Sequence, residues 1–248
     1  MKKLSYVTLG FCLLFASAHL KVNANNYQQR IDTAFHQFIK FTSMEEIDRI
    51  VQELENAPNK SRLHVYWGAY AKYKQALAYS ELHKEEKSCK KTCAKILSGA
   101  LKQLETNSHK SSEDYALMSV IKNLSISFSP ALKIPFLSNS AKSDAQSAIA
   151  ADPENIRAYI AAGVQDYYTP EMYGGGKQYE DYFLKALKLP DKKTQNPYEP
   201  SWGREEAYIY LVIHYYRQGD KEKAKQLLKE GISVCPKEPR LHHLSTQM

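Results

Sequence analysis

Two cysteines spaced four residues apart, Cys89 and Cys93, form the pair whose type and spacing come nearest to a chemical site. On a helix this spacing places both thiols on one face, where they could form a strained disulfide or bind a soft metal ion. A zinc or copper site needs more ligands than two thiolates, and the available histidine, His83, is distant. The residues alone leave three interpretations open: buried structural thiols, a disulfide, or a metal or redox site.

The remaining reactive side chains give no pattern typical of an enzyme. The eight histidines are scattered, and the adjacent pair His242 and His243 lies in the C-terminal tail. No carboxylate pair, nucleophile motif or helical histidine pair stands at a spacing that catalysis uses. We therefore predict that the protein is not an enzyme, with no catalytic residue, no metal site and no cofactor.

An unusual loop at residues 167–176 is a second candidate site, because it places a proline and three glycines between two expected helices. Glycines adopt backbone conformations that other residues avoid and end helices, so a long connection explains them. Alternatively, the loop binds a small ligand, such as an anion at the N-terminus of the next helix. It lacks the Lys-Ser/Thr ending of a phosphate loop, which argues against a nucleotide. The loop candidates are Tyr173, Gly174, Gly175, Gly176 and Trp202.

The elements that must position these residues are amphipathic helices arranged in pairs. In the clearest pair, large apolar residues recur three and four apart on one face of a first helix. A glycine then forms the turn, small residues in the second helix permit close packing, and a proline ends it. The landmarks are Glu206, Tyr208, Leu211, Tyr215, Gly219, Ala224, Leu228 and Pro236.

This pair resembles one tetratricopeptide (TPR) repeat, and less regular copies precede it. The clearest repeats cover residues 156–191 and 205–238, and the other expected first helices carry Ile31, Trp67 and Tyr115. The resemblance implies an all-α, right-handed solenoid of about five antiparallel helix pairs over residues 25–248. It also implies that Cys93 is a small helix-packing residue.

Residues 152–236 resemble more specifically a group of exported TPR proteins of Bacteroidetes-type bacteria. The likeness rests on the Thr-Pro-Glu and triple-glycine loop and on a Pro-Ser-Trp-Gly sequence at residues 200–203. The likeness supplies no catalytic residues. We interpret Trp202 as packing against the loop or a neighbouring helix.

The resembled fold implies a concave groove, lined by the first helix of each pair, that binds a protein or peptide partner. The groove would be apolar and edged with tyrosines, and its two arginines would bind carboxylates. The sequence after Pro236 looks too short to cover the last repeat, so we expect protein contact or self-association there. The groove residues are Arg157, Ile160, Val164, Tyr167, Tyr168, Glu206, Ile209, Ile213, Tyr216 and Arg217.

The N-terminus predicts export. Lys2 and Lys3 precede a short apolar run over residues 4–18, which is typical of a cleavable signal peptide and too short to span a bilayer comfortably. Cleavage after Ala18 or Ala24 fits the small residues there, and we favour Ala24, so that residues 1–24 are removed. The mature protein would be periplasmic or secreted, without a membrane span.

The charge of the mature chain gives little information about its partner. Removing three lysines with residues 1–24 lowers the net charge from +7 to +4. The lysines of residues 84–95 alternate with glutamates and lack interleaved aromatic residues, which favours a solvated helix face. We therefore predict no nucleic-acid partner.

Overall fold

The computed structural model describes residues 27–58, 60–191, 196 and 198–248, so the predicted signal peptide and both cleavage sites lie outside it. The described part is built of eleven α-helices without a strand. The first six are α1 (Tyr27–Phe41), α2 (Glu45–Asn56), α3 (Arg62–Leu82), α4 (Cys89–Glu105), α5 (Ser112–Ile126) and α6 (Ile134–Ala151). The others are α7 (Ile156–Tyr168), α8 (Tyr179–Lys188), α9 (Arg204–Arg217), α10 (Lys221–Val234) and α11 (Pro239–Gln247). Two short 3₁₀ helices, η2 (Ala131–Lys133) and η3 (Glu171–Tyr173), lie inside the third and fourth pairs.

Local sequence explains where the helices begin. The side chain of Ser61 accepts the N–H of His64 at the start of α3. At α5, Ser111 and Asp114 form a reciprocal capping box. Asp220 accepts from Lys223 at α10, after a turn in which Gly219 has a φ of 84°. These caps satisfy N–H groups that the first helical turn leaves unpaired.

The helices pack as five antiparallel pairs followed by α11, and the predicted all-α solenoid is confirmed. Small residues sit where two helices approach most closely. A Cβ at Gly163 would lie 2.6 Å from the ring of Phe183, and one at Gly231 would lie 3.0 Å from Tyr208. A larger side chain at either position would push the two helices of its pair apart.

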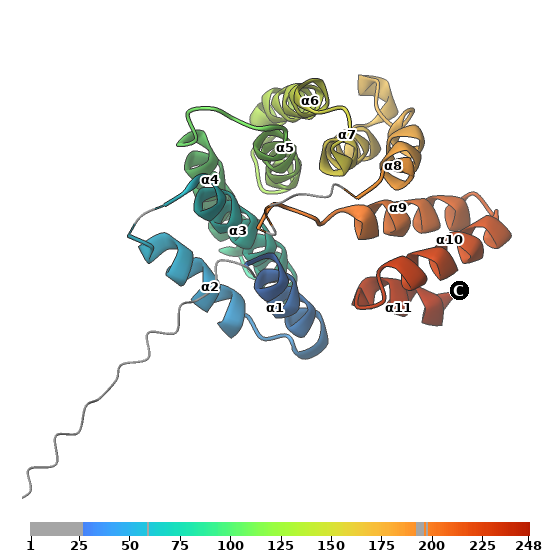
Figure 1. The fold of residues 1–248 in the computed structure, drawn as a ribbon, viewed down its shortest axis with the longest axis horizontal. Coiled ribbons are helices and arrows are strands. Elements are labelled where there is room, and N and C mark those ends of the chain that lie inside the picture. The colour runs from blue at the N-terminus through green and yellow to red at the C-terminus, as the bar shows by residue number, and fades with distance from the viewer. Residues whose placement is uncertain (1–26, 59, 192–195, 197) are drawn as a thin grey trace, which may run out of the picture.

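The successive pairs curve so that the last helices return toward the first (Figure 1). His36 of α1 lies 3.4 Å from Glu238, the residue that caps α11. Helix α11 also buries Leu241 next to Gly231, so the C-terminal residues cover part of the last pair. The expectation that only a short tail follows Pro236 is therefore corrected, while self-association at this end stays a prediction.

Helix α3 carries the three largest fully buried side chains in the described residues, Tyr66, Trp67 and Tyr70. Tyr66, Trp67 and Tyr70 pack edge to face along this helix. Such aromatic pairs contribute more than the burial of their area alone. Within the described helices, none combines the length and apolar character that crossing a membrane requires.

Candidate functional site

The inner, concave side of the solenoid holds a segment of the chain itself. The residues just before α9, shown in orange at the middle of Figure 1, cross the inner face beside α3. Trp202 stacks on Tyr70 with ring centroids 5.4 Å apart, and its indole N–H donates to the Tyr66 hydroxyl at 2.9 Å. The tryptophan is therefore an anchor that joins the fifth helix pair to the second.

The backbone of residues 198–203, which we call the inner segment, is held from several helices. The indole N–H of Trp67 donates to the Tyr198 carbonyl at 3.1 Å. Arg62, at the start of α3, forms an ion pair with Glu199 at 2.6 Å. Ser201 donates its backbone N–H to Gln28 of α1 at 2.8 Å. The contacts resemble those of an extended peptide bound across a helical groove.

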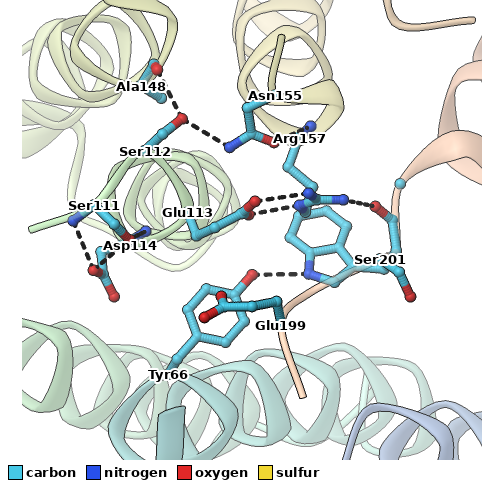
Figure 2. A network of polar contacts seen from close by, with 12 residues as sticks. Tyr66, Ser111, Ser112, Glu113, Asp114, Ala148, Asn155, Arg157, Glu199 and Ser201 are labelled. Carbon is cyan, nitrogen blue, oxygen red and sulfur yellow. Dashed lines mark hydrogen bonds and ion pairs between the residues drawn. The ribbon is translucent and has the colours of Figure 1, made fainter. Parts of the chain in front are cut away.

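Arg157 fixes the far end of the inner segment (Figure 2). Its guanidinium binds the Glu113 carboxylate through two hydrogen bonds of 2.5 and 2.7 Å, and donates to the Trp202 carbonyl at 3.1 Å. Glu113 comes from α5, so the arginine joins α5, α7 and the inner segment. Both charges are largely desolvated, and bidentate geometry is what makes such a pair favourable.

A chain of polar groups positions the helix that carries Arg157. Asn155 caps α7 by accepting the N–H of Arg157, and its amide donates to the Ser112 hydroxyl at 2.7 Å. Ser112 in turn donates to the Ala148 carbonyl at 2.8 Å. These groups are buried and hydrogen-bonded to one another (Figure 2), so the third and fourth helix pairs hold a defined relative position.

Several of the predicted groove residues are not exposed to solvent. The side chains of Arg157, Ile160 and Ile209 are buried, so they do not face an open groove. Glu206 is paired with Arg240 of α11 at 2.9 Å. Periodicity selected these residues as the face opposite the packed stripe, and the inner segment and α11 cover that face.

The other predicted groove residues lie near the C-terminal ends of α7 and α9. The Tyr167 ring contacts Tyr168, Tyr179 and Tyr210, each at a centroid distance of 5.1 Å. Tyr168 is 64% exposed and Tyr216 is 40% exposed. Val164 and Ile213 are half-buried beneath them.

An arginine completes this open region. Arg217 is exposed and donates to the Tyr167 hydroxyl at 2.7 Å. Four of the predicted groove residues therefore remain accessible, and we call them the tyrosine surface: Tyr167, Tyr168, Tyr216 and Arg217.

The backbone N–H groups in and after the triple-glycine loop form hydrogen bonds with residues of the same chain. A Cβ at Gly175 would lie 2.1 Å from the Thr169 carbonyl oxygen, and Gly174 and Gly176 have positive φ. The Asp166 carboxylate accepts the backbone N–H groups of Gln178 and Tyr179, at 2.7 and 2.9 Å. The chain's own carboxylate thus occupies the N-terminus of α8, where we considered an anionic ligand.

The cysteine pair is buried and does not form a disulfide in this structure. The Sγ atoms of Cys89 and Cys93 lie 3.9 Å apart, and both thiols are free. Burial, reinforced by Cys89, raises the pKa of the Cys93 thiol to about 12. A thiol with this pKa stays protonated at neutral pH, which makes it a poor nucleophile and metal ligand. The geometry favours the packing role over the disulfide and metal alternatives.

A group of ionisable side chains next to the inner segment was not predicted from the sequence. Lys74 is buried with its ammonium 4.7 Å from the Phe35 ring and 5.3 Å from the Tyr70 ring. Burial and the neighbouring Glu206 raise the pKa of Glu205 to about 7. The only signal in the sequence was two adjacent glutamates at the start of a helix.

Replacing Glu205 with glutamine should make the protein more stable at pH 8 than the wild type. The folded-state pKa of about 7 lies above the ordinary value of 4.5, so wild-type stability falls as pH rises through this interval. The advantage of the variant should grow by up to about 3 kcal/mol between pH 5 and pH 8. Urea denaturation of both proteins measures it, and parallel pH profiles would contradict the assignment.

Comparisons with known proteins agree with the architecture. No protein-family model matches the chain, and no curated protein matches its sequence. Among solved structures, a thermophilic TPR protein of Thermus thermophilus, TTC0263, is similar at 15% identity and a TM-score of 0.59, over 88% of this chain and 97% of that one. The HusA haemophore of Porphyromonas gingivalis is similar at 18% identity and a TM-score of 0.50, over 86% and 96%. The TPR protein YrrB aligns at 14% identity with a TM-score of 0.36.

The fold is therefore that of a TPR-like helical solenoid, as the sequence predicted. Identities of this size show the fold alone. Neither the helical-repeat neighbours nor the site geometry indicates an enzyme class. In this chain the inner segment fills part of the concave face.

Proposed function

We propose that this protein is an exported helical-repeat scaffold that binds a protein or peptide partner through the tyrosine surface. The observation that carries the proposal is the division of the predicted groove into two parts. The inner segment fills the part beside α1, α3 and α7, while the ends of α7 and α9 stay accessible. A partner then binds where aromatic rings and a cation face solvent.

The chemistry of this surface favours a segment with apolar and acidic side chains. Tyrosine rings supply rigid apolar area with a polar tip, and tyrosine and arginine are the residue types most common at binding hot spots. Arg217 is held in place by Tyr167 and still has N–H groups free to bind a carboxylate. Periplasmic or secreted location is part of the proposal and rests on the N-terminal sequence.

Alanine replacement of Tyr167 together with Arg217 should weaken partner capture about tenfold or more while leaving helical content unchanged. The measurement is a pull-down from the envelope fraction of the source cells, with circular dichroism as the folding check. The matched control is Arg49→Ala, because Arg49 is an exposed arginine on α2, away from the surface. Partner capture equal to that of the control would place the binding site elsewhere.

Haemin is a useful second probe, because one structural neighbour is named a haemophore. Met172 and Tyr173 of η3 are exposed and belong to the side-chain types that ligate haem iron. The measurement is the shift of the haemin absorption band when the protein is added. If the wild type shifts the band, Met172→Leu weakens the shift and the pull-down captures no protein, the ligand is a small planar molecule and not a protein.

A further inference from the structure

Two turns of this protein have the same construction, although they lie forty residues apart. In the first, the Ser129 hydroxyl donates to the carbonyl four residues earlier, Pro130 follows with φ −60° and ψ 146°, and the 3₁₀ helix η2 comes next. In the second, the Thr169 hydroxyl makes the same bond and Pro170 follows with φ −58° and ψ 146°, before η3. We call these the Pro turns, residues 129–133 and 169–173.

Each Pro turn holds one apolar side chain out into solvent at the same position. Leu132 is 87% exposed and Met172 is 81% exposed, and these are the largest exposed fractions among the large apolar residues that the structure describes. Phe136, in the first turn of α6, and Tyr173 are also exposed. The proline and the 3₁₀ hydrogen bonds, 2.9 Å to Pro130 and 2.8 Å to Pro170, fix the backbone of each turn.

The two Pro turns lie at the same end of neighbouring helix pairs. Helices α5 and α7 are first helices of successive pairs, run parallel and pack against each other (Figure 1). The Pro turns follow their C-terminal ends directly. Both turns, with their exposed side chains, therefore lie on the same edge of the solenoid, the edge formed by the C-terminal ends of the first helices.

We propose that the Pro turns dock this protein onto a lipid bilayer that carries anionic headgroups. Isolated, protruding side chains do not form the hollowed patch that a protein partner would pack into, whereas a bilayer accepts them without a shaped pocket. Lys133 and Lys177 flank the tips and are exposed. Residues 127–136, which contain the first Pro turn, carry Lys133 and no acidic residue, so the charge beside Leu132 and Phe136 complements an anionic surface.

The test is flotation of the purified mature chain with vesicles of phosphatidylcholine containing phosphatidylglycerol. The wild type should float with the vesicles, and Leu132→Ser combined with Phe136→Ser should lower the bound fraction about tenfold. Met172→Ser should act in the same direction. The control is Val234→Ser, a half-exposed apolar residue at the end of α10, which lies at the opposite end of the helix pairs.

Several results would overturn the proposal. The proposal is wrong if the wild type does not float with the vesicles. It is also wrong if the variant with Leu132→Ser and Phe136→Ser binds vesicles as well as the wild type. A dimer in lipid-free solution that these variants abolish would assign the Pro turns to a second copy of the chain instead. Partner capture through Tyr167 and Arg217 is measured separately, so either proposal can fail without the other.

Discussion

Replacing Trp202 with alanine should lower the free energy of unfolding by about 3–5 kcal/mol, the range for removing a large buried aromatic side chain. Trp202 is buried, stacks on Tyr70 and donates its indole N–H to Tyr66. Its loss leaves a cavity in the middle of the concave face and an unpaired hydroxyl on Tyr66. Urea denaturation followed by circular dichroism measures the change.

The control for this prediction is Tyr173→Ala, which removes an exposed aromatic ring. Substitutions at such surface positions usually change stability by less than about 0.5 kcal/mol. If Trp202→Ala cost no more than Tyr173→Ala, Trp202 would not be an anchor and the inner segment would not be packed in the groove.

The second large effect should come from Arg157. Removing this side chain leaves the largely buried Glu113 carboxylate without its partner and the Trp202 carbonyl without its donor. Breaking a buried ion pair by deleting one partner costs about 3–5 kcal/mol, and Arg157→Ala should fall in that range. Arg49→Ala, which removes an exposed pair with Glu46, should cost less than about 1 kcal/mol.

A double variant separates the charge effect from loss of packing. Arg157→Met with Glu113→Leu removes both charges and keeps apolar bulk, so it should recover most of the loss seen in Arg157→Ala. A double variant as unstable as the single one would show that the cost comes from packing. The interpretation of Arg157 as a buried electrostatic link would then be wrong.

Local periodicity predicted most of the fold. The first helices identified by Ile31, Trp67, Tyr115 and Tyr208 are α1, α3, α5 and α9, and the repeat predicted at residues 156–191 begins with α7. These features depend on contacts within and between consecutive helices, which the 3.6-residue pattern reports directly.

The site could be predicted only in part, because its decisive contacts join residues far apart in the sequence. Trp202 was expected to pack against the loop or a neighbouring helix, but it packs on Tyr66 and Tyr70, more than 130 residues earlier. Arg157 was expected to bind a carboxylate of a partner, and it binds the carboxylate of Glu113 instead. Residue chemistry was informative, whereas nothing local in the sequence says which groups the chain will bring together.

Long-range packing also decides which of the predicted groove residues stay exposed. Tyr168, Tyr216 and Arg217 lie at the C-terminal ends of first helices, beyond the reach of the inner segment and of α11. Their exposure follows from where those two segments pack. The shared construction of the Pro turns was visible in the sequence as Ser-Pro and Thr-Pro, but its meaning required the matching backbone angles.

Hydrogen exchange at the two indole N–H groups tests most directly whether the chain's own inner segment occupies the concave face. Trp67 donates across the groove to the Tyr198 carbonyl, and Trp202 donates to the Tyr66 hydroxyl. These are the only tryptophans in the sequence, so two indole resonances report on the whole segment. The structure predicts that both are strongly protected in the native protein. Exchange of the Trp202 indole at the rate of a solvent-exposed tryptophan, in a protein with native helical content, would contradict it.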